Sequence, residues 1–206
     1  MSVQVSGESI GKRFNRNWLF RKINFSCETG ESLAILGNNG SGKSTLLKII
    51  SGVMPPSEGQ LTYRVQNHNL YPDRYYRHIS FVAPYMELPE ELTLAEFLNF
   101  HTRFKPLVNG FTIQNLLHEL RFQKAANQPL SQFSSGMKQR LKLGIALHAQ
   151  TPVLLLDEPC TNLDDYNIAW YRDTVRNLLS DKIVIISSNA AIEYDFCEKQ
   201  LSVQNR

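Results

Sequence analysis

Eight consecutive residues of this sequence have the types and order of a phosphate-binding loop. An apolar run precedes them and a helix-like segment follows. Glycines let the backbone turn tightly with its N–H groups pointing inward, and the following helix directs its positive end to the same point. The Lys could then reach the β- and γ-phosphates of a nucleotide, and the Ser after it could ligate Mg²⁺. The eight residues are Gly37, Asn38, Asn39, Gly40, Ser41, Gly42, Lys43 and Ser44. A glycine-rich turn that binds nothing is the alternative, and the complete pattern argues against it.

Two adjacent carboxylates, Asp157 and Glu158, follow a second apolar run at residues 153–156. Four apolar residues in a row are typical of a strand buried on both faces of a parallel sheet. Asp157 could hold Mg²⁺ through water and Glu158 could orient or deprotonate an attacking water, because neighbouring side chains of a strand point in different directions. Acidic residues can also solvate a strand end or cap a helix. The phosphate-binding loop in the same chain favours the magnesium and catalytic roles.

A third apolar run, residues 183–186, is followed by two serines and Asn189. The carboxyl ends of parallel strands share one edge of a sheet, and that edge is where ligands bind in such folds. We therefore expect Gly37, Asp157 and Asn189 to surround one nucleotide.

The first 30 residues predict an antiparallel pair of strands. Apolar and polar residues alternate at residues 3–5 and again at residues 23–27. Phe14 and Trp18 are expected in the basic turn between them. Phe14 could stack on an adenine ring or pack within the turn, and its spacing leaves both roles open. Trp18 is expected to cover the core.

Helices are expected in the middle of the chain. Between residues 89 and 127 the apolar spacing is helical, and Thr93 with Glu96 forms the pattern of a capping box. Another helix opens at Ser134, Ser135 and Gly136 and runs to about residue 150. Its free N–H groups and hydroxyls offer a second anion site, although serines at a helix start are usually only caps. Residues 59–65 and 79–82 read as strands, and the tyrosines between them are expected on the surface.

Composition narrows the class of protein. The chain has 206 residues, of which 42% are hydrophobic, which suits one large domain or a domain with an inserted lobe. A net charge of +3 gives little support for a nucleic-acid partner. Cys27, Cys160 and Cys197 lack metal-ligand spacing and fit inert thiols in a reducing cytosol. No apolar run approaches the roughly 18 residues that span a bilayer, so a soluble chain is expected.

Four motifs, taken in order, resemble those of the ATP-binding subunit of ABC transporters. They are the phosphate-binding loop, the turn at residues 134–137, the strand ending in Asp157 and Glu158, and the turn at residues 161–164. The resemblance covers nearly the whole chain. It implies an α/β fold of the P-loop NTPase type, with a RecA-like, mostly parallel sheet core, an antiparallel β edge and an inserted helical lobe. Residues 1–85 and 151–206 would form the core and residues 86–150 the lobe, within a single domain of residues 1–206.

The resemblance also implies how such a chain works. Two copies, identical or merely related, would pair head to tail and enclose two ATP molecules with Mg²⁺. The residues implied at the nucleotide, from both sides of the interface, are Lys43, Ser44, Thr45, Ser134, Ser135 and Gly136. Asp164 would contact the opposite subunit, and Phe14 matches the position that stacks on adenine. A separate transmembrane subunit would dock around residues 85–88 and the helical lobe, so we expect this chain in the cytoplasm, peripherally on the cytoplasmic face of a membrane.

The sequence departs from the family pattern at three points. The family's Leu-Ser-Gly-Gly-Gln signature reads Phe-Ser-Ser-Gly-Met at residues 133–137. The glutamine expected soon after residue 82 is missing, and Tyr85 stands nearby. The expected histidine is Asn189, whose amide can donate a hydrogen bond to the γ-phosphate but cannot carry a proton. We therefore expect slow ATP hydrolysis with Glu158 as general base.

Two other functions remain compatible with these motifs. The missing glutamine and histidine would suit a catalytically weak ATP-binding module that regulates or assembles a heterodimeric or non-transport complex. A nucleic-acid-linked ATPase of the same superfamily is disfavoured, because such proteins usually carry two ATPase domains or long coiled-coil insertions.

Overall fold

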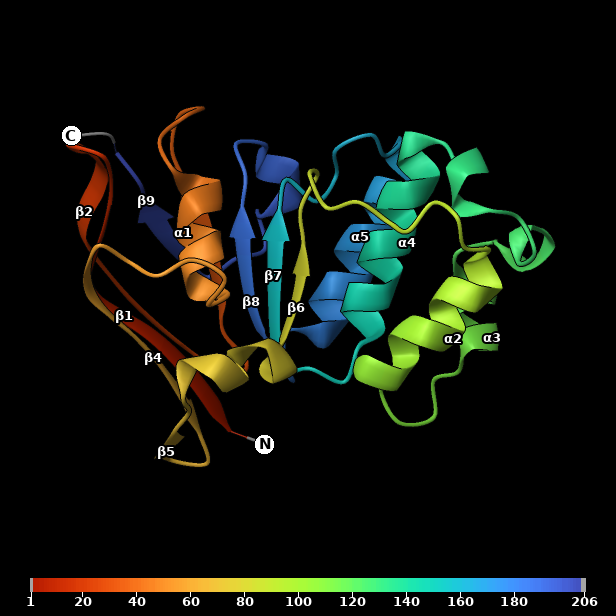
Figure 1. Cartoon of the computed structure of the whole chain (residues 1–206), viewed down its shortest axis with the longest axis horizontal. Helices are drawn as coiled ribbons and strands as arrows, with labels where there is room; N and C mark the ends of the chain where they lie inside the picture. The colour runs from red at the N-terminus through yellow and green to blue at the C-terminus, as the bar shows by residue number, and fades with distance from the viewer. Residues whose placement is uncertain (1, 205–206) are drawn as a thin grey trace.

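The computed structural model describes residues 2–204 and has a parallel sheet at its centre (Figure 1). The strand order is β6-β7-β8-β3-β9, and every neighbouring pair is parallel. The three middle strands are almost wholly buried, as their unbroken apolar sequences predict. The strands are β3 (Ser32–Leu36), β6 (Ile79–Val82), β7 (Val153–Asp157), β8 (Ile183–Ser187) and β9 (Lys199–Ser202).

The antiparallel strands form a second sheet. Its order is β2-β1-β4-β5, and it stands beside the parallel sheet with helix α1 (Lys43–Ile50) packed between the two (Figure 1). The expected fold class is confirmed, with the antiparallel strands set apart from the parallel ones rather than added to their edge. The strands are β1 (Val3–Phe14), β2 (Asn17–Glu28), β4 (Glu58–Val65) and β5 (His68–Asn69).

The turn between the first two strands is shorter than the sequence predicts. Phe14 is the last residue of β1 and pairs with Asn17 at the start of β2, so only two residues form the turn. Asn15 turns the chain there with a φ of 53°, a conformation that Asn tolerates well. Trp18 lies within β2, partly exposed, with the guanidinium groups of Arg13 and Arg21 over its ring. It does not cover the core as expected.

The helices lie largely where the apolar spacing predicts. The capping box at Thr93 is confirmed, since its hydroxyl accepts a hydrogen bond from the Glu96 N–H and the Glu96 carboxylate accepts one from the Thr93 N–H. Besides α1, the α-helices are α2 (Leu94–Phe104), α3 (Ile113–Glu119), α4 (Ser135–His148) and α5 (Asp165–Leu178). The 3₁₀ helices are η1 (Pro72–His78), η2 (Gln123–Ala125), η3 (Leu130–Gln132) and η4 (Ala191–Glu193).

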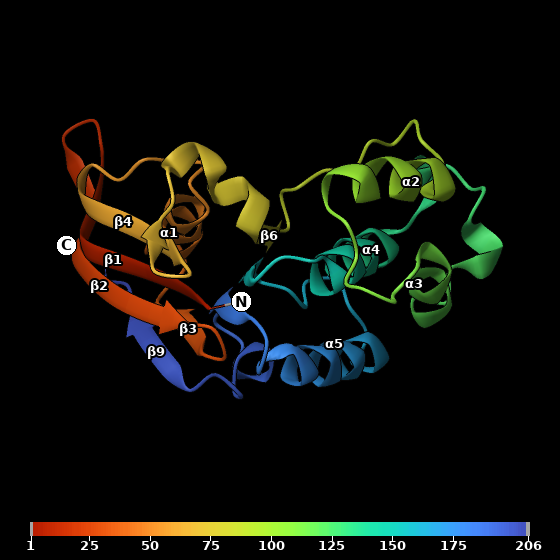
Figure 2. The ribbon, with the colours of Figure 1, turned by 90° about the horizontal axis from the view of Figure 1, so that it is seen from below.

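Helices α2 and α3 form a helical half of the molecule with its own apolar core, set apart from the two sheets (Figure 2). Helix α4 contributes to that core through Leu141 and Ile145, and to the core beneath the parallel sheet through Leu143 and Leu147. The helix therefore joins the two halves. The division of the chain at residues 86 and 150 remains a prediction.

One of the three tyrosines expected on the surface is buried. Tyr71 and Tyr76 are exposed, but Tyr75 is only 3% exposed. Its ring packs 4.2 Å from that of Tyr63, centroid to centroid, and its hydroxyl donates to the Leu61 carbonyl. Helix η1 is thereby fixed to the antiparallel sheet.

The cysteines are free, and burial raises the pKa of each thiol to about 12. A thiol with so high a pKa is a poor nucleophile near neutral pH, which agrees with the expected inert role. Within residues 2–204, no helix is long and apolar enough to cross a membrane.

Candidate functional site

The phosphate-binding loop joins β3 to α1 at the carboxyl edge of the parallel sheet. Gly42 precedes the helix with a φ of 103°, and a Cβ there would lie 2.7 Å from Leu19. Gly37 has a φ of 152°, and a Cβ on it would lie 2.4 Å from the Val203 carbonyl oxygen. Both positions therefore require glycine, because the close neighbours at Gly37 and Gly42 leave no room for a side chain.

Lys43 is only 6% exposed and lies against the loop. Its Nζ donates to the carbonyl oxygens of Gly37 (2.8 Å) and Asn38 (3.3 Å). The buried hydroxyl of Ser41 has no hydrogen-bond partner among the described residues, whereas Asn39 is exposed at the tip of the loop. An ammonium held by carbonyl oxygens, beside a donor without a partner, is a site that an anion would complete.

Two carboxylates at the end of β7 lie in different environments. Asp157 is 2% exposed, and its Oδ1 is buried without a hydrogen-bond partner in the described chain. Glu158 is exposed and has a left-handed backbone with a φ of 44°, which is unfavourable for a residue with a Cβ. A buried carboxylate oxygen without a donor fits a cation. Mg²⁺ commonly binds to one or two carboxylates plus phosphates and water, so Asp157 with the Ser44 hydroxyl is a suitable protein set.

The segment after β8 meets the phosphate-binding loop, as expected. The Asn189 amide nitrogen donates to the Asn39 side-chain oxygen at 2.6 Å, which joins residues 150 positions apart. Leu36, Gly37, Ser188 and Asn189 line an open pocket of about 520 Å³ there. The amide that was expected to face a γ-phosphate is bonded to the loop itself.

The start of α4 lies apart from the phosphate-binding loop. Ser134 caps the helix, with its hydroxyl accepting from the Met137 N–H at 3.2 Å. A Cβ on Gly136 would lie 2.7 Å from the Asn162 carbonyl oxygen, so the glycine allows close packing on the turn that follows Glu158. In Figure 1, α1 and α4 lie on opposite sides of β6 and β7. Ser134 therefore does not complete the phosphate site of its own chain.

Phe14 is 48% exposed at the end of β1, and the Lys12 ammonium lies 5.4 Å from its ring centroid. It does not belong to the apolar cores of the described chain. About half of the residue is therefore accessible, and its stacking on adenine remains a prediction.

Asp164 has a structural role within its own chain. Its Oδ1 caps α5 by accepting from the backbone N–H of Asn167 at 2.9 Å and from the Asn167 amide at 2.7 Å. One carboxylate oxygen is therefore used within the chain.

Tyr85 follows β6 and contacts a lysine of helix α1. The Lys48 ammonium stands 4.2 Å from its ring centroid, and Met86 and its neighbours, rather than Tyr85, line the groove described next. Burial raises the pKa of the Tyr85 hydroxyl to about 12, and the Asp157 carboxylate contributes to the shift. A phenol thus stands within electrostatic reach of Asp157, near the place of the missing glutamine.

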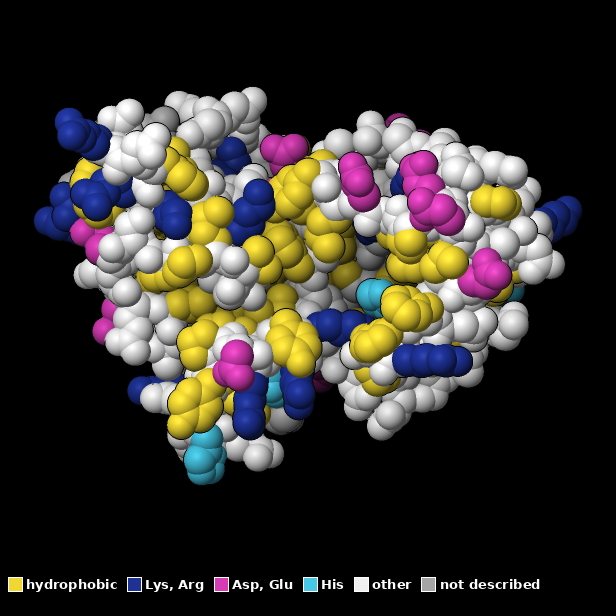
Figure 3. Space-filling model, in the orientation of Figure 1, with side chains coloured by type: hydrophobic (Ala, Val, Ile, Leu, Met, Phe, Trp, Pro, Cys, Tyr) yellow, Lys and Arg dark blue, Asp and Glu magenta, His cyan; other side chains and the backbone are white. Residues whose placement is uncertain are grey.

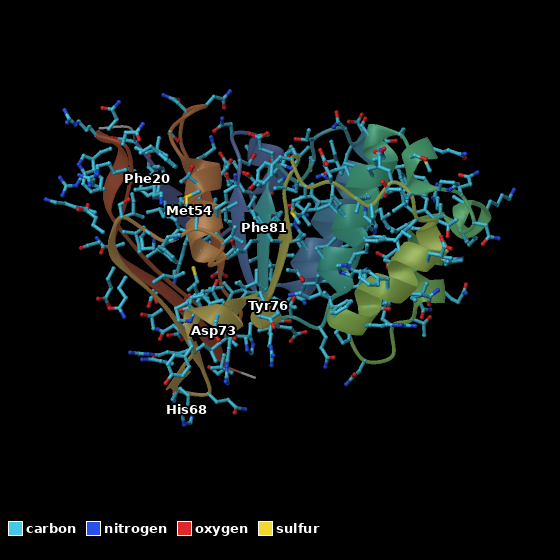
Figure 4. All side chains as sticks on the ribbon, in the orientation of Figure 1. Phe20, Met54, His68, Asp73, Tyr76 and Phe81 are labelled. Atoms are coloured by element: carbon cyan, nitrogen blue, oxygen red, sulfur yellow. The ribbon has the colours of Figure 1, made fainter. Side chains whose placement is uncertain are left out.

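An apolar groove of about 400 Å³ runs between the sheets and the helical half. Figure 3 shows it as a hollow with hydrophobic side chains on its walls, and Figure 4 labels Tyr76 and Phe81 beside it. Its apolar lining includes Val53, Tyr76, Phe81, Met86, Leu88 and Phe97. Residues 86–88 therefore lie where a docking surface was expected, whereas nothing in the sequence pattern indicated the hollow itself.

Two half-buried lysines lie in this groove. Lys142 on α4 donates to the carbonyl oxygens of Ala83 (3.1 Å) and Met86 (3.2 Å), and Lys105 donates to that of Ile79. Burial lowers the pKa of both. Neither has a carboxylate partner in the described part of the chain, and Glu87 also lines the groove, so two ammonium groups and one carboxylate lie on its apolar walls.

Comparison with known sequences gives one consistent family. A family model described as "ABC transporter" matches residues 20–161. The cytochrome c biogenesis ATP-binding export protein of Reclinomonas americana is 35% identical over 158 residues, which are 72% of this chain and 67% of that protein. ABC transporter A family member 8 of Dictyostelium discoideum is 30% identical over 89% of this chain and 22% of that protein. This chain thus spans only about a fifth of the length of some curated relatives.

Solved structures agree with the fold. A structure titled as the ATP-binding subunit of an ABC transporter superposes with a TM-score of 0.83 at 24% identity and covers 98% of this chain and 86% of that one. A dimeric, post-hydrolysis ATP-binding cassette bound to ADP and phosphate gives a TM-score of 0.82 at 24% identity, over 97% and 94% of the two chains. At this identity these structures show the fold alone.

Proposed function

Because this chain belongs to the ABC transporter family, we propose that it is an ATP-binding subunit that hydrolyses Mg-ATP between two paired domains and drives a separate membrane protein. One observation carries the proposal. The loop with the buried Lys43, the buried Asp157 with its unpaired oxygen, and Asn189 come together at one edge of the parallel sheet. Lys43 and Asp157 provide the charge that a magnesium-bound triphosphate needs, and Asn189 provides a neutral hydrogen-bond donor.

Each residue has a defined role in this proposal. The loop N–H groups and Lys43 bind the phosphates, and Ser44 and Asp157 hold Mg²⁺. The Mg²⁺ ion would neutralise charge that develops on the phosphate oxygens. Glu158, exposed at the end of β7, accepts a proton from the attacking water. Phe14 offers its open face to the adenine ring.

The second side of the site comes from another chain. Ser134, Ser135 and Gly136 open a 14-residue helix that lies across β6 and β7 from α1, so they stand apart from the phosphate-binding loop of their own chain. A head-to-tail pair would bring this helix start, with its free N–H groups, to the γ-phosphate of the partner. Asp164, which still has one oxygen outside its cap, would contact the partner as well.

We expect turnover to be slow. Asn189 cannot take up a proton, and Tyr85 lies near the position of the missing glutamine. A positioned acid–base group typically contributes about 10²- to 10⁴-fold, whereas most catalysis of phosphoryl transfer comes from positioning and electrostatics. Hydrolysis is therefore reduced and not abolished.

The apolar groove is the proposed docking site of the membrane subunit. Its walls would take the apolar face of a short helix, and Lys105 and Lys142 would pair with a carboxylate on that helix. Docking there would keep the chain on the cytoplasmic face of the membrane. The motion of the helical half relative to the sheets would pass to the partner through α4, which packs in both cores.

Phosphate release from Mg-ATP tests the catalytic part of this proposal. The wild-type protein should release phosphate about 10²- to 10⁴-fold faster than Glu158→Gln, because the amide cannot accept the proton. Glu158→Gln should also bind ATP as tightly as wild type and form a nucleotide-dependent dimer, measured by analytical ultracentrifugation. Glu91→Gln, the same change at an exposed position, is the matched control.

Two results would contradict the proposal. One is equal phosphate release by wild type and Glu158→Gln. The other is a strictly monomeric Glu158→Gln protein at saturating ATP that also fails to bind any related ATPase chain. A dimer without turnover, activated by a catalytically complete partner, would instead indicate the regulatory module considered above.

A further inference from the structure

A buried carboxyl group that the proposed mechanism does not use lies behind the turn that carries Glu158. Glu193, the last residue of η4, is only 5% exposed. Its Oε1 accepts a hydrogen bond from the Cys160 backbone N–H at 2.7 Å, whereas its Oε2 is buried without a hydrogen-bond partner among the described residues. The nearby Ser188 hydroxyl bonds to the backbone of Ala190. A buried carboxyl group with only one of its two oxygens hydrogen-bonded lowers the stability of the fold, so we expect that it performs a role.

The turn that Glu193 contacts is strained. Glu158 has a φ of 44°, which persists only where neighbouring groups hold it. The Glu158 N–H donates to the Ser187 carbonyl at 2.9 Å, and its carbonyl accepts from the Thr161 N–H at 3.2 Å. Two side chains contact the next part of the same turn: the Gln139 amide donates to the Pro159 carbonyl at 2.8 Å, and Glu193 accepts from the Cys160 N–H.

The segment that follows β7 and the segment that follows β8 are thus joined at two points. The bond between Glu158 and Ser187 ties them at the strand ends, and the bond between Cys160 and Glu193 ties them one turn farther along. Glu193 is itself anchored, since the Tyr171 hydroxyl on α5 donates to its carbonyl oxygen at 3.0 Å. Burial raises the pKa of the Glu193 carboxyl, the Ser188 hydroxyl and the Cys160 N–H act against this shift, and the charge of Glu158 adds to it.

We propose that Glu193 is a positioning residue, which holds the turn of residues 158–160 in the conformation that aims the Glu158 carboxylate at the attacking water. The proposal rests on the role of Glu158 as general base given above. Glu193 acts through the Cys160 N–H and touches neither phosphates nor metal. Its loss should therefore slow the chemical step and leave ATP binding unchanged, because a small misplacement of a reacting group strongly lowers the rate.

Substitutions at Glu193 distinguish the effect of side-chain length from the effect of side-chain charge. Glu193→Gln keeps an oxygen that can accept from the Cys160 N–H, whereas Glu193→Asp keeps the charge but is one methylene too short. We expect Glu193→Ala and Glu193→Asp to lower kcat about 10- to 100-fold with the ATP Kd within about twofold of wild type. Glu193→Gln should recover most of kcat. Asp195→Ala is the control, since this acid on the same segment pairs outward with Arg172 and should leave kcat unchanged.

A double-substitution cycle tests whether Glu193 acts through Glu158. In the Glu158→Gln background, adding Glu193→Asp should leave the residual single-turnover rate within about twofold. An equal loss in both backgrounds would overturn the proposal, as would Glu193→Asp outperforming Glu193→Gln or losing ATP affinity and Tm together with kcat. If Glu158→Gln alone leaves turnover unchanged, the general-base assignment fails instead, whatever the Glu193 variants do.

Discussion

At the scale of single residues, the described chain satisfies part of its nucleotide site with its own groups. The Lys43 ammonium donates to loop carbonyls, and the Asn189 amide donates to the Asn39 side chain. Both groups that would meet phosphates are therefore hydrogen-bonded within the chain. Ser41 and Asp157 keep a buried oxygen without one. Ligand binding would exchange the first set of hydrogen bonds and complete the second, since buried polar groups without partners are costly.

Asn189→His should raise the rate of ATP hydrolysis about 10-fold or more. An imidazole at this edge of the sheet can carry a charge and pass a proton, which the amide cannot. Steady-state phosphate release at saturating Mg-ATP measures the change. Asn189→Ala is the control, because it removes the bond to Asn39 without adding an acid–base group. Equal activation by alanine would mean that freeing the loop, rather than proton transfer, limits the rate.

Phe14→Ala should raise the Kd for ATP about 3- to 10-fold, the loss expected for one aromatic stacking contact. The Tm should stay close to that of wild type, because the ring is half exposed at the end of β1. Phe14→Tyr should bind ATP normally. Fluorescent nucleotide titration measures the affinities, and an unchanged Kd in Phe14→Ala would remove this residue from the site.

At the scale of elements, helix α4 connects the two halves of the molecule. Its start packs on the turn after β7, where Gly136 meets the Asn162 carbonyl and Gln139 donates to the Pro159 carbonyl at 2.8 Å. Its far end leads to β7, and there the buried Lys182 before β8 donates to the carbonyl oxygens of Ala149 (2.7 Å) and Thr151 (2.6 Å). A change at the turn after β7 would therefore pass directly to the helical half through α4.

Lys182 makes the stability of the folded protein depend on pH. Burial lowers the pKa of its ammonium from 10.5 to about 8. Between these two values the unfolded chain keeps the proton that the folded chain has lost, so stability rises with pH across this window. Relative to Lys182→Met, wild type should gain at most about 3 kcal/mol in the free energy of unfolding as pH rises through it. Urea unfolding at about pH 7.5 and about pH 9.5 measures the difference, and a constant difference between the two proteins would contradict the expected shift.

At the scale of the whole molecule, an apolar groove lies between the two sheets and the helical half, and it carries two lysines without acidic partners among residues 2–204. An apolar hollow of this kind marks an interaction site more often than a random surface does. Residues 86–88 line this groove, and they follow strand β6 closely along the chain. The surface that would meet a membrane protein is thus connected to the edge that would bind ATP.

Val53→Asp should abolish recruitment of the chain to membranes that contain its partner, without changing ATP affinity. Val53 lines the groove but is 76% exposed, so the carboxylate should not disturb folding. Co-sedimentation with native membranes and ATP titration measure the two effects. Tyr71→Asp, a change at a similarly exposed apolar residue outside the groove, is the control. Equal membrane binding by wild type and Val53→Asp would exclude the groove as the docking site.

The sequence by itself determined what depends on neighbours along the chain. Glycine spacing defined the phosphate-binding loop, unbroken apolar runs defined the buried strands, and Thr93 with Glu96 defined a helix start. These signals are local, because turn, strand and cap each need only a few consecutive residues. They also predicted that Gly37 and Asp157 lie at the same edge, since parallel strands share one.

Only the tertiary structure decided what depends on packing between distant segments. It separated the antiparallel strands into a second sheet, buried Tyr75 and left Phe14 exposed. It also brought Glu193 behind the Glu158 turn, 33 residues from its partner Cys160. Residue types and spacing carry no signal for such contacts, because they arise where two surfaces meet and each surface is assembled from separate parts of the chain.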